Sequence, residues 1–176
     1  MPKGLVVAVV VAGLAALVAV LSFLMQGAPF VPTNDGDMAD MLKAVAKLPK
    51  SKRLIDLGAG DGKLVIEFAQ LGFRVHGVEL KPWLVRRARR HIAKAGLPSR
   101  ASMSLGDLWK TDTSGYDVVL LYAIPHVMGR LERKLTAELK PGSLVICNCF
   151  AFPNLKPQRT LGNIRVYEIG IQLNQH

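Results

Sequence analysis

A glycine-rich turn is the part of this sequence with the most readable chemistry. It reads Asp-Leu-Gly-Ala-Gly-Asp-Gly over residues 56–62 and follows an apolar run. Glycine at Gly58 and Gly60 lets the backbone turn sharply and approach a ligand with no Cβ in the way. A pyrophosphate fingerprint requires G-x-G-x-x-G, whereas here the third glycine comes one residue early and Lys63 takes the sixth place. The turn therefore predicts a bound ligand and argues against a dinucleotide.

Three acidic residues lie at the ends of three successive expected strands. Asp56 ends the first, where a carboxylate can meet a ligand ammonium. Glu79 ends the second, where an acid commonly accepts both hydroxyls of a ribose. Asp107 follows the third and is placed to accept a hydrogen bond from the exocyclic amine of adenine. One such acid alone often only caps the next helix, but three beside a glycine turn favour a cationic nucleoside. S-adenosylmethionine is such a ligand.

These residues need a sheet to bring them together. After Pro49 the chain alternates short β-type runs with helical ones, which is the pattern of a parallel, doubly wound α/β sheet. We expect strands at residues 53–58, 74–80, 101–105, 116–123, 143–150 and 163–172. We expect helices at residues 62–71, 82–96 and 127–139. Because the carboxyl ends of parallel strands meet at one edge, the three acids should lie there together.

The first residues predict a membrane anchor. Residues 4–25 carry no charge, and as a helix they are long enough to cross about 30 Å of hydrocarbon. A cleaved signal peptide is the competing interpretation, but its apolar region is typically shorter, and a core helix of a small domain normally has a polar face. We therefore expect a transmembrane anchor in residues 1–30. Residues 31–50 form a linker and a short helix, at residues 38–48, over the cofactor site, and residues 51–176 form the cofactor-binding domain.

The charge balance indicates an anionic partner. The chain has a formal net charge of +10, and its only charged residue before Asp35 is Lys3, so the charge belongs to the part after the anchor. The densest basic stretch is residues 86–94, on one expected helix. Such a balance fits a phospholipid surface or a nucleic acid and does not choose between them.

Several segments resemble one known family. They are Leu-Ile-Asp-Leu-Gly-Ala-Gly-Asp-Gly-Lys from residue 54, Glu-Leu-Lys-Pro-Trp-Leu-Val from residue 79 and Gly-Asp-Leu-Trp-Lys from residue 106. With the apolar start and the proline- and lysine-bearing loop after residue 150, they resemble the small membrane-anchored lysine methyltransferases of the ATP synthase c subunit and the adenine nucleotide translocase. The resemblance implies a Rossmann-like seven-β-strand methyltransferase sheet with an N-terminal transmembrane helix, and S-adenosylmethionine as the cofactor.

The resemblance also implies roles for single residues. The implied cofactor ligands are Gly58, Gly60, Glu79 and Asp107, to which the strand-end argument adds Asp56. Pro32 and Thr33 are implied to lie over the bound cofactor, and Trp109 to pack beside its adenine. No metal site is expected.

The residues that would orient the methyl-accepting amine are less well defined by the sequence. The loop after the fourth expected strand reads Tyr-Ala-Ile-Pro-His over residues 122–126, which departs from the better-known Asn or Asp, Pro-Pro and aromatic motif. Tyr122 and His126 are the catalytic candidates for orienting the acceptor amine. Tyr122 is favoured because it lies nearer the strand end, and His126 can equally cap the next helix. Burial of a lysine amine lowers its pKa, so no dedicated base is required.

The predicted function is methylation of a lysine on a membrane protein, c-subunit-like or carrier-like. The charges flanking the anchor would place the catalytic domain outside the cell, but the need for S-adenosylmethionine places it on the cytoplasmic or matrix side. Three alternatives stay open. They are a methyltransferase of lipids or small amphiphiles, a non-catalytic tether that binds the cofactor, and an RNA methyltransferase, which the charge favours and the membrane span disfavours.

Overall fold

The computed structural model describes residues 9, 11–16, 33–148 and 150–170. The chain divides into two units, Met1–Phe30 and Val31–His176. Within the described ranges, no helix is long and apolar enough to cross a membrane. The anchor expected at residues 4–25 falls mostly on residues outside those ranges, so it stays a prediction.

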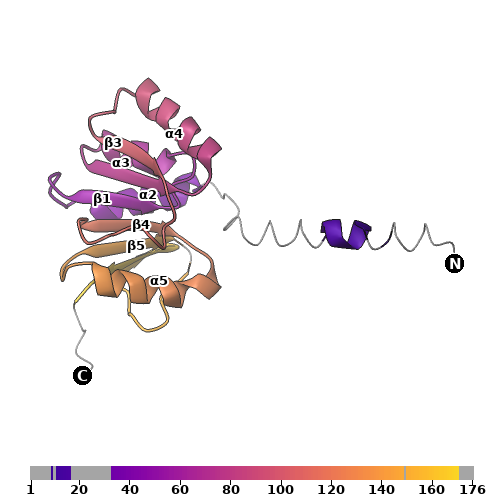
Figure 1. The fold of residues 1–176 in the computed structure, drawn as a ribbon. Coiled ribbons are helices and arrows are strands. Elements are labelled where there is room, and N and C mark those ends of the chain that lie inside the picture. The colour runs from indigo at the N-terminus through magenta and orange to yellow at the C-terminus, as the bar shows by residue number, and fades with distance from the viewer. Residues whose placement is uncertain (1–8, 10, 17–32, 149, 171–176) are drawn as a thin grey trace. The chain divides into compact units, whose positions relative to one another are not determined.

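Seven strands form one sheet in the order β3-β2-β1-β4-β5-β7-β6, and Figure 1 shows β3, β1, β4 and β5 in this order across the molecule. The strands are β1 (Arg53–Leu57), β2 (Arg74–Glu79), β3 (Ala101–Leu105), β4 (Val118–Tyr122), β5 (Leu144–Asn148), β6 (Arg159–Leu161) and β7 (Ile164–Glu168). The first five are parallel, and β7 and β6 are antiparallel. The seven-stranded α/β sheet is therefore confirmed. The sequence pattern missed β6 because it is very short and lies in a polar loop.

Helices cover the two faces of the sheet unequally. The helices of the second unit are α2 (Asp35–Val45), α3 (Lys63–Gln70), α4 (Pro82–Lys94) and α5 (Pro125–Glu138). Apolar residues of α2, α3 and α4 join one buried cluster, whereas those of α5 join a second cluster on the opposite face. The expected helices are present within two residues of their ends, apart from α2, which begins three residues earlier than its apolar spacing suggested. Asn34 explains this start, because its side chain accepts a hydrogen bond from the Asp37 backbone N–H as an N-cap.

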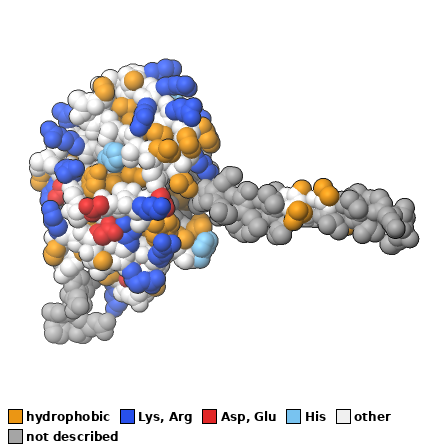
Figure 2. All heavy atoms as spheres, viewed as in Figure 1, with side chains coloured by type: hydrophobic (Ala, Val, Ile, Leu, Met, Phe, Trp, Pro, Cys, Tyr) orange, Lys and Arg blue, Asp and Glu red, His pale blue; other side chains and the backbone are white. Residues whose placement is uncertain are grey.

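The basic stretch of residues 86–94 lies on α4. The helix buries Leu84, Val85, Ala88 and Ile92 against the sheet, and the arginines between them are exposed. Figure 2 shows lysine and arginine side chains gathered over this helix, which lies at the top of the view in Figure 1. The stretch is therefore an exposed basic face of α4.

The connection from β3 to β4 is unusual for a parallel sheet. Crossover connections between parallel strands usually contain a helix, but residues 106–117 form turns and loop. The second apolar cluster takes in Leu108, Trp109 and Tyr116 from this loop and reaches no residue of β3. The face of β2 and β3 opposite α3 and α4 is therefore free of any helix within the described ranges.

Close packing of α3 on the sheet depends on Gly77 in the middle of β2. A Cβ at this position would lie 2.3 Å from the Met103 sulfur and 2.8 Å from carbons of both Ala59 and Val65. We expect Gly77→Ala to cost about 1–3 kcal/mol of folding free energy through overpacking. The melting temperature should fall by roughly 2–4 °C per kcal/mol for a domain of this size.

Gly129→Ala is the matched control for this measurement. Gly129 lies inside α5, and an added Cβ would meet only ordinary contacts, the nearest at 3.6 Å. Alanine is the better helix former, so this variant should melt at or above the wild-type temperature. A Gly77→Ala protein as stable as wild type would mean that the tight approach of α3 to β2 is absent.

Candidate active site

The strand order creates a switch point between β1 and β4, because the chain continues to β2 and β3 on one side and to β5 on the other. Ligands of open α/β sheets bind outside the carboxyl ends of the strands at such a point. Four polar residues are the last or next-to-last residues of strands there. They are Asp56 of β1, Glu79 of β2, Tyr122 of β4 and Asn148 of β5. Side chains alternate along a strand, so these four share the face of core residues Leu54, Leu120 and Ile146.

The glycine turn after β1 forms the floor of this edge. Gly58 and Gly60 have φ of 87° and 55°, in the left-handed region that favours glycine. The backbone N–H groups of Gly58 and Ala59 both donate to the Val78 carbonyl, at 2.9 and 3.0 Å. A Cβ on Gly58 would meet nothing within 4 Å. The turn is thus held against β2 and leaves open space beside Gly58, as a ligand cradle requires.

Glu79 links the turn to the end of β2. Its Oε2 accepts a hydrogen bond from the Gly60 N–H at 3.0 Å, and its Oε1 accepts one from the Lys81 N–H at 2.9 Å. The side chain is buried, so its orientation is set by these two bonds. Each carboxylate oxygen has a further lone pair, which leaves the group able to accept from two neighbouring hydroxyls of a ligand.

Asp56 is the most perturbed acid of this edge. It is 2% exposed, and its Oδ2 has no hydrogen-bond partner among the described residues. Burial, and secondarily the charge of Glu79, raises the pKa of Asp56 from its ordinary value of 3.8 to about 7. A buried acceptor with a raised pKa is a common property of a functional site. A cationic donor beside Asp56 would pair with Oδ2 and stabilise the carboxylate.

Asp107 and Trp109 lie in the loop after β3. The Asp107 Oδ1 accepts from the Trp109 N–H at 2.9 Å, and its backbone carbonyl accepts from the Thr111 hydroxyl. The Asp107 Oδ2 has no partner among the described residues. The Arg130 guanidinium lies 3.9 Å from the centre of the Trp109 ring, an attractive cation–π contact. Asp107 is therefore fixed with one oxygen available, and Arg130 occupies one face of the indole.

The two catalytic candidates differ in position. Tyr122 is the last residue of β4, is half-buried and pairs in register with Asn148. His126 is exposed in the first turn of α5, whose N-cap residue is Ile124 and which has no side-chain cap hydrogen bond. His126 is thus not the helix cap. Tyr122 shares the face and edge of Asp56 and is the better placed of the two.

The residues expected over the site are only partly described. Pro32 lies outside the described ranges. The Thr33 carbonyl accepts from the Lys63 ammonium at 3.3 Å, and Asp35 pairs with the same ammonium at 2.9 Å. Lys63 begins α3 directly after the glycine turn, so these contacts tie Thr33 to the mouth of the site.

Asn148 is a site residue that sequence reasoning missed. It is 1% exposed, and its amide Nδ2 donates to the Asp37 carboxylate at 3.2 Å. Asp37 also accepts from Asn163 at 3.2 Å and from the Asn34 side chain at 2.8 Å. With its nitrogen facing a carboxylate, the Asn148 Oδ1 points elsewhere, and it has no partner among the described residues. A polar residue ending an otherwise apolar strand was the available signal.

The edge as a whole is a row of hydrogen-bond acceptors. The buried side-chain atoms without a partner in the described part of the chain are Asp56 Oδ2 and Asn148 Oδ1, and both lie on this edge. Leaving a buried acceptor unpaired costs about 1–3 kcal/mol. A ligand that brings N–H or O–H donors, or a positive charge, would remove that cost.

Comparison with known proteins gives one family match and several relatives. The family described as "ANTKMT methyltransferase domain" matches residues 56–159. An ATP synthase c-subunit lysine N-methyltransferase of Rattus norvegicus is 37% identical over 76% of this chain and 61% of its own length. A protein-lysine N-methyltransferase of Saccharolobus islandicus is 34% identical over 76% of this chain and 83% of its own length. The chain thus spans about three fifths of the length of the rat relative.

A solved structure has the same fold. The crystal structure of an RNA methyltransferase from Salinibacter ruber in complex with S-adenosyl-L-homocysteine matches with a TM-score of 0.72 and 34% identity, over 79% of this chain and 92% of that one.

Proposed function

We propose that this chain, which belongs to the ANTKMT methyltransferase family, transfers a methyl group from S-adenosylmethionine to a lysine amine of a membrane protein. The observation that carries the proposal is the row of acceptors at the switch point, with two buried oxygens that lack partners among the described residues. The names of the relatives support lysine as the acceptor, since those from rat and Saccharolobus are both called lysine N-methyltransferases.

The residues at the edge fit the methyl donor. S-adenosylmethionine, when bound, supplies an electrophilic methyl carbon on a sulfonium. Glu79 has the free lone pairs to hold the ribose hydroxyls, and Asp56 Oδ2 has the open position for the ammonium. Asp107 Oδ2 can accept from the adenine amine. Gly58 leaves the space that a side chain would fill.

The acceptor amine is assigned to the β4 and β5 side of the site. A lysine must be neutral to react, and a dry site lowers its pKa because the charged form is disfavoured there. Asn148 Oδ1, held in place by Asp37, can accept one N–H of the neutral amine and so direct its lone pair. Tyr122 borders the same place on β4 and is proposed to orient the amine and exclude water, while His126 lies farther along the chain.

The part of the proposal that concerns the membrane rests on the apolar segment near the start of the sequence. A transmembrane anchor at residues 4–25 would hold the enzyme in the plane of a membrane-embedded substrate and raise its effective concentration. The proposed substrate is a c-subunit-like or carrier-like protein. We propose that the protein crosses the membrane once and that its catalytic domain lies on the cytoplasmic or matrix side.

RNA is a second candidate acceptor, favoured by the 34% identity to the Salinibacter enzyme and by the net charge of +10. Lipid methylation is the third, since an anchor and a basic face would also serve it. The same fold supports many acceptors, so the acceptor has to be measured.

Transfer of labelled methyl from S-adenosylmethionine into a membrane extract separates these acceptors. We expect the wild type to label one protein band, and Glu79→Gln to lose that label at low S-adenosylmethionine concentration, because the variant binds the donor much more weakly. Ribonuclease should leave the label unchanged, and the lipid fraction should stay unlabelled. Label that follows the lipid or disappears with ribonuclease would overturn the lysine assignment.

A further inference from the structure

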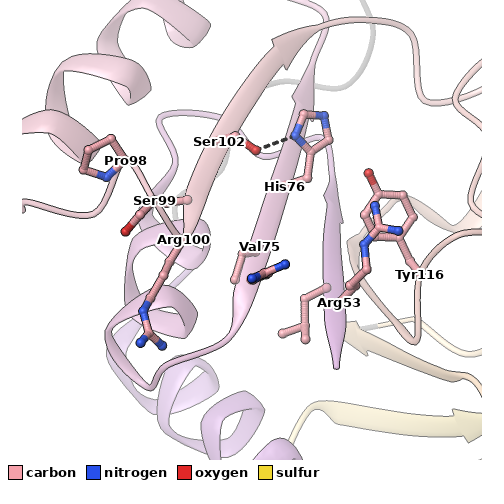
Figure 3. Close-up of a pocket in the computed structure, with 11 residues that line it drawn as sticks. Arg53, Val75, His76, Pro98, Ser99, Arg100, Ser102 and Tyr116 are labelled. Atoms are coloured by element: carbon pink, nitrogen blue, oxygen red, sulfur yellow. Dashed lines mark hydrogen bonds between the residues drawn. The ribbon is translucent and has the colours of Figure 1, made fainter. Parts of the chain in front are cut away.

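A hollow lies at the amino ends of the strands, opposite the edge that carries Asp56, Glu79, Tyr122 and Asn148. It has a volume of about 410 Å³ and is open to solvent. Its walls come from the first residues of β1, β2 and β3 and from the segments before β3 and β4, as the close-up in Figure 3 shows. Because parallel strands carry their active site at the carboxyl ends, this hollow at the amino ends is a separate place.

The hollow is strongly basic. Among the described residues, its lining includes Arg53, Arg74 and Arg100 and no carboxylate. The Arg53 guanidinium lies 5.0 Å from the centre of the Tyr116 ring, and Figure 3 shows the two side by side. Arg100 donates to the Gly72 carbonyl at 2.6 Å. Neither Arg53 nor Arg74 makes a side-chain hydrogen bond or ion pair to any described residue, so their N–H groups can serve a ligand.

One carboxylate lies near these charges but is already engaged. Asp117 accepts from the Lys52 ammonium at 3.0 Å and from the Arg53 backbone N–H at 2.8 Å. It therefore does not neutralise the guanidinium of Arg53, and the hollow keeps its positive charge.

Neutral polar groups form one wall. His76 Nδ1 is 2.8 Å from the Ser102 hydroxyl, and its Nε2 is 2.9 Å from that of Ser104. The pKa of His76 lies below its ordinary value, first because of burial and second because of Arg53. The imidazole is thus mainly neutral at pH 7 and is held by the two serine hydroxyls, and Tyr116 adds a further hydroxyl to the lining of the hollow.

Contacts within the fold account for only part of this arrangement, because Arg53 lies over Tyr116 and Arg100 donates to Gly72, whereas the Arg74 side chain has no such contact among the described residues. The helix that would normally cover this face is replaced by the loop of residues 106–117, which leaves a polar sheet surface exposed. Guanidinium groups that share a hollow repel one another, with an effect reduced by water. An anion in the hollow would turn that repulsion into attraction.

We propose that this hollow is a second ligand site, distinct from the methyl-transfer site, which binds a phosphate group. The planar fork of Arg donates two parallel hydrogen bonds to phosphate oxygens, and Arg53 and Arg74 each have that fork unpaired among the described residues. The volume lies within the range of small-ligand sites, about 300–1,000 Å³. A polynucleotide would instead need a basic track that follows a line of phosphates, whereas here the arginines surround one hollow.

The same phosphate chemistry has two sources, a soluble phosphorylated molecule and the headgroup of an anionic lipid. One readout distinguishes them in the full-length protein, placed in phosphatidylcholine bilayer discs. The readout is the ring resonance of His76 in protein with isotope-labelled histidine, identified by its loss in His76→Gln. No step of it depends on methyl transfer, so it stands or falls apart from the proposed function.

Inorganic phosphate should shift the His76 resonance saturably and raise the His76 pKa, because an anion offsets the charge of Arg53. In Arg53→Gln/Arg74→Gln the phosphate affinity should fall at least tenfold. Arg90→Gln removes one exposed charge from α4 and should bind phosphate like the wild type. The same loss in Arg90→Gln, or no saturable shift with either inorganic phosphate or the anionic lipid of the second arm, would overturn the proposal.

The lipid arm replaces part of the phosphatidylcholine with phosphatidylglycerol and omits free phosphate. The same His76 shift, lost in Arg53→Gln/Arg74→Gln, assigns the site to a lipid headgroup. A shift with phosphate alone assigns it to a soluble ligand, and both results support the site. A shift produced by an RNA oligonucleotide and by neither phosphate source would overturn the proposal.

Discussion

Glu79→Gln should weaken S-adenosylmethionine binding on the order of 100-fold. The change keeps the size of the side chain and removes its charge, so one of the bonds from the Gly60 and Lys81 N–H groups loses its acceptor. The ribose hydroxyls lose a charged acceptor as well. Hydrogen bonds to charged groups contribute about 1.5–3 kcal/mol each, and a loss of about 3 kcal/mol corresponds to roughly 100-fold in affinity.

Isothermal titration with S-adenosylmethionine measures this effect, with Glu67→Gln of α3 as the control for loss of one negative charge. The control should bind like the wild type, and a thermal melt should show both variants folded. Unchanged affinity in Glu79→Gln, or an equal loss in Glu67→Gln, would show that Glu79 does not hold the ligand.

Asp56→Asn should raise the stability of the unliganded protein and lower its affinity for S-adenosylmethionine. The pKa of Asp56 is raised to about 7 by burial and then by Glu79. A carboxyl with a raised pKa contributes stability that is fully present below its ordinary pKa, near 4, and is lost as pH rises to about 7. Asparagine does not titrate, so the variant does not lose this stability as pH rises. Its free energy of unfolding should therefore exceed that of the wild type by a few kcal/mol at pH 7, since one pKa unit corresponds to about 1.4 kcal/mol.

The same carboxyl should make ligand binding depend on pH. If the ligand ammonium pairs with ionised Asp56, wild-type affinity for S-adenosylmethionine should rise roughly tenfold per pH unit below pH 7 and level off above it. Asp56→Asn should bind more weakly and lose this dependence. Asp40→Asn, which breaks only the surface pair with Lys43, is the control. Melting curves and titrations from pH 5 to 8 test both parts, and parallel behaviour of Asp56→Asn and wild type would contradict them.

The sheet could be predicted from the sequence because its signal is local. Apolar runs such as residues 118–122 predict strands buried on both faces of the sheet. Pro82 and Gly96 mark where α4 begins and ends. The acids at positions 56 and 79 were predictable because parallel strands bring their carboxyl ends to one edge.

The features that escaped prediction depend on contacts between distant residues. Asn148 became a site residue only when Asp37, far away in the sequence, was seen to hold its amide. The tight packing at Gly77 requires the positions of Met103 and Val65. The basic hollow lies on a sheet face that is left uncovered because residues 106–117 form a loop where a helix is usual. The sequence pattern of that segment did not predict which face it would leave open.

The most direct test of the proposed activity identifies the methylated atom. Protein labelled from S-adenosylmethionine in membrane extract is hydrolysed in acid, and the labelled amino acids are separated against standards. We predict that the label migrates with N-methylated lysine and is absent when Glu79→Gln replaces the wild type. Label in methylarginine or another residue, or label unaffected by Glu79→Gln, would contradict the proposal that this protein is a lysine methyltransferase whose active site is the row of hydrogen-bond acceptors at the strand ends.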